Sequence, residues 1–333
     1  MKEEKKMKKI LATILVLALV LSLAACGSSP AKSESPEPQE KAETFKVGIL
    51  QQLEHPALDA ATEGFKQALT DRLGDRVSFD FVSAQNDINN CTTIANKFVS
   101  DKVDLIMANA TSALQAAASA TGEIPIVGVS ITDYESAGVL KGDPSAPGGN
   151  VTGASDLAPL DLQAKLLVEV VPEAKTVGIV YCSSEANSIY QAETIKVHFE
   201  ELGLKVKNFT VADSNEIQPV VTAAVEEVDA LYIPTDNTMA DNMELVKNIT
   251  LNAKIPVISG EENACKNGGL VTLSISYFDM GYKAGELAAD ILEGKAEPAS
   301  SPIVYCTEVE RKFNPEVKEA LGIELPADIS PIE

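Results

Sequence analysis

The segments Lys46–Leu50 (KVGIL) and Thr176–Tyr181 (TVGIVY) decide the fold, because each opens an alternating series of short apolar runs and amphipathic stretches. That alternation is the pattern of βαβ units in a parallel sheet. The VGI of the first segment returns in the second, and Ile124–Val127 (IPIV) returns as Ile255–Ile258 (IPVI), both about 130 residues later. We therefore predict an α/β fold of two Rossmann-like lobes with parallel sheets and similar topology.

The pattern predicts the elements of each lobe in order. In the first lobe we expect strands over 46–50, 77–83, 103–108 and 124–129, with helices over 57–73, 88–100 and 112–121. In the second lobe we expect strands over 176–181, 205–211, 230–233 and 255–259, with helices over 188–202, 216–225 and 239–252.

The N-terminus has the features of a secretory signal. Met1–Lys9 is rich in lysine, Ile10–Val20 is apolar apart from Thr13, and Leu23–Cys26 reads LAAC. A basic region, a short apolar region and small residues before a cleavage point are typical of a signal peptide, and LAAC fits the bacterial lipobox. The apolar run is too short to span a bilayer comfortably. We predict that residues 1–25 are removed and that Cys26 carries a lipid. The protein is then exported and anchored to the outer face of the cytoplasmic membrane.

Residues 26–44 contain the lipidated cysteine and a segment rich in Pro, Ser and Glu with few apolar side chains. Such a segment cannot bury enough surface to fold, so we predict a flexible tether.

The charge and the cysteines exclude several classes of function. The formal net charge is −22 at pH 7, which repels nucleic acid and anionic lipid. Four further cysteines (Cys91, Cys182, Cys265 and Cys306) form no CxxC and have no histidine at metal-ligand spacing. We expect no nucleic-acid partner, no metal and no cofactor. Disulfides are compatible with export, but a body of this size does not need them.

Polar segments follow the predicted strands in both halves. Ligands of open parallel sheets bind beyond the carboxyl ends of the strands, so two facing lobes would line one cleft with these segments. They are Gln51–Pro56, Asn109–Ser112, Ser130–Tyr134, Cys182–Ser188, Pro234–Thr238 and Gly260–Asn263. This layout predicts a hinged binding protein that closes around its ligand.

Four strings make the sequence recognisable: EHPALD (54–59), ATSALQAA (110–117), NVTGASD (150–156) and SSEANS (183–188). They resemble the ABC-transporter substrate-binding lipoprotein family that includes tryptophan- and other aromatic amino-acid-binding proteins, and the resemblance covers residues 45–325. It implies a type I periplasmic-binding-protein fold with three crossovers and a hinge. It also implies an α-amino acid ligand, especially an aromatic one, and a permease and an ATPase as partners. We expect a monomer.

By analogy with this family, the crossovers fall at Asn150–Asp156, Ser274–Phe278 and near Ser300–Thr307, and residues 279–293 form a returning helix. The N-terminal lobe then comprises residues 45–153 plus 278–302, and the C-terminal lobe 154–277 plus 303–333.

An amino acid zwitterion needs donors for its carboxylate and acceptors for its ammonium. Amides and hydroxyls at a helix start can bind the carboxylate without arginine. The donor candidates are Asn109, Thr111, Ser112, Ser184 and Ser188, and the acid candidates are Asp133, Asp156, Glu185, Asp236 and Glu261. We favour Asp236 for the ammonium because it directly follows a strand. The same loops add Glu54, His55, Ser130, Thr132, Asn187 and Asn237 as candidate ligand-binding residues.

Tyr134, Tyr277 and Phe278 are candidates for stacking on an aromatic ligand, whereas Tyr181 and Tyr232 fall in strands and are expected in the core. No GxSxG or HExxH pattern occurs, so nothing indicates catalysis. A nucleoside or sugar carrier on the same scaffold and a ligand-sensing receptor module remain alternatives.

Overall fold

The computed structural model describes residues 43–306 and 308–332. The predicted signal peptide, Cys26 and nearly all of the predicted tether lie outside the described residues. Within the described part of the chain, no helix is long and apolar enough to cross a membrane.

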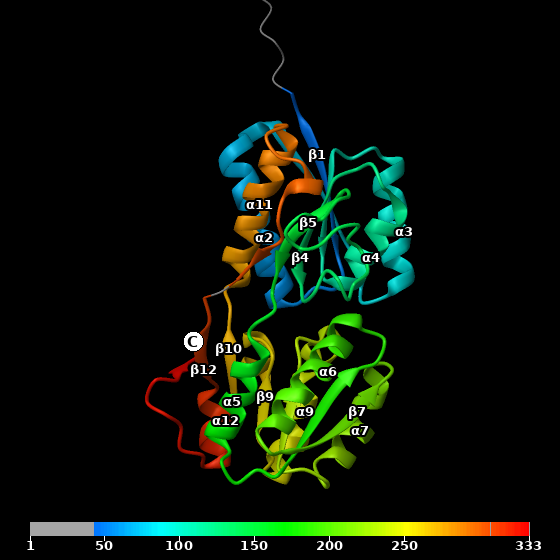
Figure 1. Cartoon of the computed structure of the whole chain (residues 1–333). Coiled ribbons are helices and arrows are strands. Elements are labelled where there is room, and N and C mark those ends of the chain that lie inside the picture. Colours follow the sequence, from blue (N-terminus) through cyan, green and yellow to red (C-terminus); the bar gives the residue numbers. More distant parts are fainter. Residues whose placement is uncertain (1–42, 307, 333) are drawn as a thin grey trace, which may run out of the picture. The chain divides into compact units, whose positions relative to one another are not determined.

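The first lobe is a six-stranded parallel sheet of order β11-β5-β4-β3-β1-β2 with helices on both faces (Figure 1). Its strands are β1 (Phe45–Gln51), β2 (Val77–Ser83), β3 (Leu105–Asn109), β4 (Ile126–Ile131), β5 (Val151–Ser155) and β11 (Val304–Tyr305). Its helices are α2 (Pro56–Leu73), α3 (Ile88–Ser100), α4 (Thr111–Ala120) and α11 (Tyr277–Leu292), with short 3₁₀ turns at Gly74–Arg76 and Pro298–Ser300.

Alternation along the strands divides the core of this lobe between the two faces. Leu105 and Met107 of β3 pack in the cluster that contains α2 and α11, whereas Ile106 and Ala108 pack in the cluster that contains α3 and α4. Because successive side chains of a strand point to opposite faces, a strand buried on both faces is apolar throughout. The sheet is therefore held rigidly, and its carboxyl edge is a fixed platform for loops.

The second lobe repeats this plan in a seven-stranded sheet of order β13-β12-β10-β9-β8-β6-β7, with only β12 antiparallel to its neighbour β10. Its strands are β6 (Thr176–Cys182), β7 (Lys205–Val211), β8 (Ala230–Ile233), β9 (Val257–Ser259), β10 (Val271–Ser274), β12 (Glu310–Phe313) and β13 (Ser330–Pro331). Its helices are α5 (Leu160–Val170), α6 (Ala186–Glu201), α7 (Ile217–Ala224), α8 (Asn237–Ala240), α9 (Met243–Ala253), α10 (Glu262–Asn267) and α12 (Pro315–Leu321), with a 3₁₀ turn at Ser214–Glu216.

The predicted α/β fold with two mainly parallel sheets is confirmed, and several predicted bounds match those observed. One predicted helix is wrong. The segment 239–252 is two helices, α8 and α9, because the chain turns at Asp241–Asn242. The predicted starts of the C-terminal lobe's segments at residues 154 and 303 are also wrong. Ala154 and Ser155 pair with Val304 and Tyr305, so all four residues belong to the first sheet.

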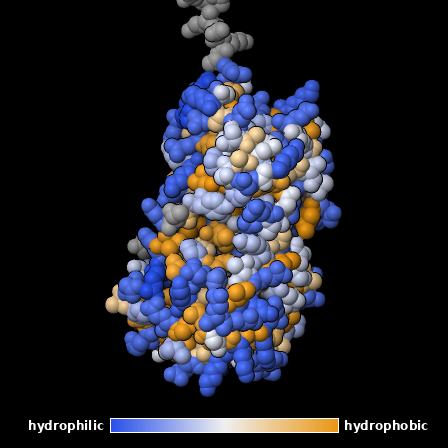
Figure 2. All heavy atoms as spheres, viewed as in Figure 1, coloured by the Kyte–Doolittle hydropathy of each residue, from blue (hydrophilic) through white to orange (hydrophobic). Residues whose placement is uncertain are grey.

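The chain passes between the lobes three times: from β5 to α5, from β10 to α11 and from β11 to β12. A solvent-open groove lies on this side and includes Ile275, Phe278 and Val309 in its lining. Figure 2 shows apolar surface between the lobes at the level of the crossovers, on a face that is otherwise mainly hydrophilic.

Candidate functional site

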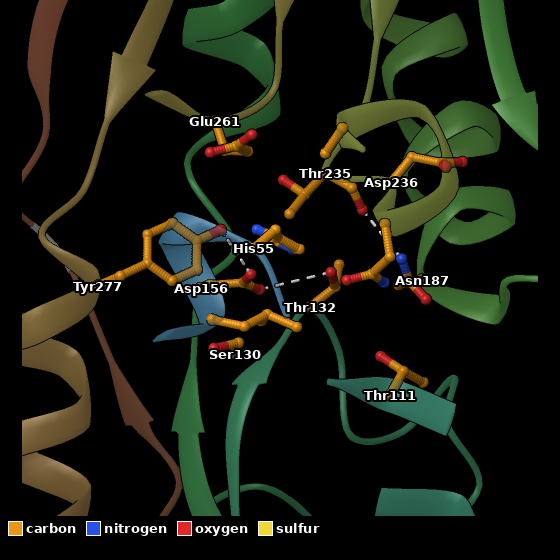
Figure 3. A pocket seen from close by; sticks show the side chains of 13 residues that line it. His55, Thr111, Ser130, Thr132, Asp156, Asn187, Thr235, Asp236, Glu261 and Tyr277 are labelled. Carbon is orange, nitrogen blue, oxygen red and sulfur yellow. Dashed lines mark hydrogen bonds between the residues drawn. The ribbon is translucent and has the colours of Figure 1, made fainter. Parts of the chain in front are cut away.

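A small pocket lies between the lobes, at the carboxyl ends of strands from both sheets (Figure 3). It is lined by His55, Leu58, Thr111, Ser130, Thr132, Asp156, Asn187, Thr235, Asp236, Asn237, Ala240, Glu261 and Tyr277. The cavity left among these side chains is about 10 Å³, which is room for about one water. An amino acid can therefore enter only when the lobes move apart or the lining side chains move.

The first lobe contributes the start of helix α4. Ala110 precedes the helix with φ 81°, and its own side chain makes no capping bond. Ser112 N donates to Gln52 Oε1 over 3.3 Å, and Thr111 lines the pocket. Because the first amides of a helix lack intrahelical acceptors and carry the positive end of its dipole, this helix start suits an anionic group.

Ser130 presents a strained backbone to the same pocket. Its φ is 57°, and the pairing of β4 with β5 shifts register between Gly128 and Ile131. The left-handed conformation is costly for a residue with a Cβ, and it re-aims the side chain. The Ser130 hydroxyl is buried and has no hydrogen-bond partner.

Asp156 lies where the chain first crosses between the lobes. The hydroxyl of Tyr277 donates to its Oδ2 over 3.0 Å, and the hydroxyl of Thr132 lies 3.5 Å from its Oδ1 (Figure 3). Burial raises the pKa of Asp156 to about 6, although the bond from Tyr277 opposes the rise. Since no Lys or Arg lines the pocket, the side chains around it offer this carboxylate no cation.

Asp236 and Glu261 also border the pocket, but each caps a helix with its carboxylate. Asp236 accepts from Cys182 N over 2.6 Å and from Met239 N over 2.8 Å. Glu261 accepts from the amides of Asn263 and Ala264. Burial raises the pKa of Glu261 to about 7, and burial with the nearby Glu185 raises the pKa of Asp236.

Asp236 is the acid that the sequence favours for the ammonium because it directly follows a strand. Here it is 2% exposed, and its carboxylate caps α8. Figure 3 shows its carboxylate on the second-lobe side, away from Asp156 and Tyr277.

Glu185 is held entirely by protein donors. Its carboxylate accepts from the backbone and side chain of both Asn237 and Thr238, and from Asn187 Nδ2. It fixes the start of α8 and is outside the lining of the pocket.

His55 of the first lobe and Asn187 of the second each have a buried polar atom without a hydrogen-bond partner. His55 lies at the start of α2 but makes no capping bond with its side chain, and burial lowers its pKa so that the ring is neutral at pH 7. Asn187 Nδ2 donates to Thr235 O over 2.9 Å. His55 Nδ1 and Asn187 Oδ1 have no partner, as is also true of Ser130 Oγ. Unpaired buried polar atoms are rare, and these three lie in one pocket.

The structure brings nine of the sixteen predicted ligand-binding residues to this pocket: His55, Thr111, Ser130, Thr132, Asp156, Asn187, Asp236, Asn237 and Glu261. Ser112, Ser184 and Glu185 line a neighbouring groove. Glu54 is exposed and accepts from Gln85, and Asp133 accepts from Ser136 N in a turn. Asn109 and Ser188 are fully buried, the first donating to Leu58 O and Thr62, the second accepting from Asn187.

Sequence reasoning missed Leu58, Thr235 and Ala240. Leu58 is one helical turn from His55, and Thr235 and Ala240 flank Asp236 and Asn237, so the periodicity of α2 and the neighbours of Asp236 were the available signals.

The three candidate stacking aromatics differ in their surroundings. Tyr134 is 1% exposed, and its hydroxyl donates to the carbonyls of Gly128 and Ala154, so it is a core residue. A Cβ on Gly128 or Gly153 would collide with that hydroxyl. Tyr277 lines the pocket, and Phe278 lines the groove on the crossover side. Tyr181 and Tyr232 are buried, as predicted for strand residues.

Comparison with protein families matches residues 46–332 to the model of the ABC transporter substrate binding protein family. The chain belongs to this family. It is 38% identical to a tyrosine-binding protein of Clostridioides difficile (strain R20291) over 331 residues, which is 97% of this chain and 95% of the relative.

Two solved structures are similar to this chain. One is a Streptococcus domain in complex with L-Trp, with a TM-score of 0.84 at 34% identity over 87% of this chain and 100% of that one. The other is a ligand-free, open substrate-binding protein with adhesive properties from Clostridium difficile, with a TM-score of 0.68 at 39% identity over 87% of this chain and 99% of that one. The structure with the higher identity therefore superposes less well than the L-Trp complex. The predicted type I periplasmic-binding-protein fold of this substrate-binding protein is confirmed.

Proposed function

We propose that this substrate-binding protein captures an aromatic α-amino acid between its lobes and delivers it to the permease and ATPase of an importer. The observation that carries the proposal is Asp156. It is a buried carboxylate whose side-chain donors are two hydroxyls, in a pocket whose other polar atoms include three without partners.

The ligand's ammonium group binds Asp156. A buried carboxylate without a cation is costly, and an ammonium supplies both the charge and the donors it lacks. Asp236 and Glu261 already accept two backbone amides each, which leaves Asp156 as the acid whose oxygens are most available.

The ligand's carboxylate binds at the start of α4, beside Thr111 and the unpaired hydroxyl of Ser130. The helix dipole and the hydroxyls stabilise the anion there without a basic side chain. Leu58, Ala240 and the neutral ring of His55 supply the less polar part of the lining. The tyrosine-binding relative and the L-Trp complex support an aromatic side chain in that part.

Calorimetry on protein freed of copurified solute tests the proposal. The protein is unfolded in guanidinium, washed and refolded, and is then titrated with L-tyrosine, L-tryptophan and L-phenylalanine. L-aspartate, uridine and galactose serve as controls. We expect saturable heat with at least one aromatic amino acid and none with uridine or galactose. Binding of uridine or galactose but of no amino acid would refute the ligand class and favour the carrier alternative.

We also propose that Cys26 carries a lipid that anchors the protein at the outer face of the cytoplasmic membrane. The LAAC string after a basic and an apolar region supports this. Cys26→Ser should move the protein from the membrane fraction to the soluble fraction of the host cells. Unchanged membrane retention of the variant would argue against the anchor.

A further inference from the structure

The loop after β2 carries two consecutive residues in the left-handed region. Gln85 has φ 55° and Asn86 has φ 58°. The loop is held by bonds from Asn86 N to Gln52 O over 2.8 Å and from Asp87 N to Ala84 O over 3.1 Å. Strain of this kind persists only where the surrounding structure fixes it, and here it fixes the direction of the Asn86 side chain.

Asn86 is the middle of a hydrogen-bond chain that joins the lobes. Ser112 N donates to Gln52 Oε1 (3.3 Å), and Gln52 Nε2 donates to Asn86 Oδ1 (3.0 Å). Asn86 Nδ2 then donates to Thr238 Oγ1 (3.2 Å), whose hydroxyl donates to Glu185 Oε1 (2.8 Å). All four bonds donate in the same direction, from Ser112 toward the carboxylate of Glu185. Hydrogen bonds arranged in this way polarise one another.

Each end of this hydrogen-bond chain lies next to residues that line the binding pocket. Ser112 belongs to the first turn of α4, next to Thr111. Glu185 binds the amides at the start of α8, which supplies Asn237 and Ala240 to the pocket. The chain lies along a separate polar groove whose lining includes none of the crossover residues. Rotation of the lobes about the crossovers therefore separates Asn86 from Thr238.

We propose that the Gln52–Asn86–Thr238–Glu185 chain is a latch that slows release of the ligand, with Asn86 and Gln52 as positioning residues that do not touch it. The proposal rests on the proposed function for its ligand. A bond that exists only when the lobes are closed stabilises the closed complex, so its loss appears in dissociation rather than in association.

Stopped-flow fluorescence tests the latch with L-tryptophan as the probe. The chain contains no tryptophan, so the indole signal comes from the ligand alone. For Asn86→Ala we expect dissociation about three- to tenfold faster, the range of one hydrogen bond, with unchanged association. The unfolding midpoint without ligand should also fall, because Asn86 holds Gln52 within the first lobe and alanine is strained at φ 58°. Thr238→Val should behave similarly, Thr238→Ser should retain the wild-type rate, and the double variant should be no faster than the faster single variant.

Asn96→Ala is the matched control, because Asn96 donates its amide to Thr92 O on exposed α3. A dissociation rate of Asn86→Ala equal to that of this control would overturn the latch. So would rates that multiply in the double variant.

Cross-linking separates failure of the latch from failure of the ligand assignment. In the ligand-free Asn86→Cys, Thr238→Cys protein, oxidation should form a disulfide between the two new cysteines, identified by peptide mapping. A wild type that does not bind L-tryptophan would then count against the proposed ligand while the cross-link still supports the latch. Absence of the cross-link would overturn the latch whatever the ligand is.

Discussion

The two lobes both line the pocket with residues from the carboxyl ends of their strands, but they differ in the acidic residues that they contribute. The first lobe contributes His55, Leu58, Thr111, Ser130 and Thr132, none of which is charged at neutral pH. The second lobe contributes two carboxylates, Asp236 and Glu261, and each caps the helix that follows it. Asp156 belongs to neither face, because it stands on the first crossover.

The difference shows that the number of acidic residues around a pocket does not tell which of them binds a cation. A carboxylate that accepts two backbone amides has those lone pairs occupied by donors that cannot turn away, even where burial raises its pKa. The side-chain donors to Asp156 are two hydroxyls, which can turn toward another acceptor when an ammonium arrives. The comparison therefore supports the proposal that the ligand's ammonium binds at the crossover and its carboxylate at the first lobe.

The largest effect should follow from Asp156→Asn. Removal of one partner of a desolvated charge pair costs about 2–5 kcal/mol, which is roughly thirtyfold to several-thousandfold in affinity. Calorimetry with L-tyrosine should show this loss, while the circular dichroism spectrum remains that of the wild type. Asp133→Asn, at a turn outside the pocket, is the control and should bind normally. Near-native affinity of Asp156→Asn would show that the ligand's ammonium does not bind at the crossover.

Asp236→Ala should mainly lower stability. It leaves the buried amides of Cys182 and Met239 without their acceptor, a loss of about 1–3 kcal/mol in the free energy of unfolding. Urea titration measures this. Asp236→Asn should lose less, because an amide oxygen still caps α8. If Asp236→Ala stayed stable but lost binding as severely as Asp156→Asn, the distinction between a capping acid and a ligand-binding acid would be wrong. The sequence prediction that Asp236 binds the ammonium would then be supported.

Acid should weaken binding through Asp156. Its pKa is about 6 in the ligand-free protein, and an ammonium favours the ionised form. The ionised fraction falls about tenfold between pH 7 and pH 5, so affinity for L-tyrosine should fall by about the same factor. Calorimetry at the two pH values tests this, and the loss attributable to Asp156 should vanish in Asp156→Asn. An equal loss in that variant would assign the titration to another group.

The same pKa values give the opposite trend for folding without ligand. Burial raises the pKa of Asp156 to about 6 and of Glu261 to about 7, from 3.8 and 4.5. The folded chain therefore binds more protons than the unfolded chain between those values. The stability these two groups contribute is complete below about pH 4 and is lost as the pH rises through 7.

The strand 230–233 has the predicted bounds, because a strand that is buried on both faces is apolar throughout and is not mistaken for a loop. The edge strands 77–83 and 205–211 also have the predicted bounds, although they are partly exposed and contain polar residues. Several elements of the second lobe were missed: α5, α10, β10, β12 and α12. The segments of α10 and β12 are short and polar, and tertiary packing rather than periodicity determines them.

The sequence predicted which loops form the site, but not which role each of their residues has. Whether an acid caps a helix depends on backbone angles that the residue type does not determine, so the sequence favoured Asp236 over Asp156 only because Asp236 directly follows a strand. Tyr134 looked available for stacking because it follows a strand. The space that Gly128 and Gly153 leave for its hydroxyl becomes visible only when β4 and β5 pair.

The smallest effect concerns Ser130, where backbone strain and ligand contact can be separated. Ser130→Ala and Ser130→Gly both remove the unpaired hydroxyl, so both should weaken L-tyrosine binding by about 0.5–1.5 kcal/mol, roughly two- to twelvefold. They differ in the backbone, because φ is 57° at this position and glycine adopts it without a steric penalty. Relief of strain outweighs the extra entropy that glycine loses on folding, so Ser130→Gly should be more stable than Ser130→Ala by up to about 1 kcal/mol. Urea titration without ligand measures the difference in stability, and calorimetry measures the shared loss of affinity. Equal stability would mean that the left-handed backbone is not strained. Undiminished affinity in both variants would mean that the first lobe binds the ligand's carboxylate without this hydroxyl.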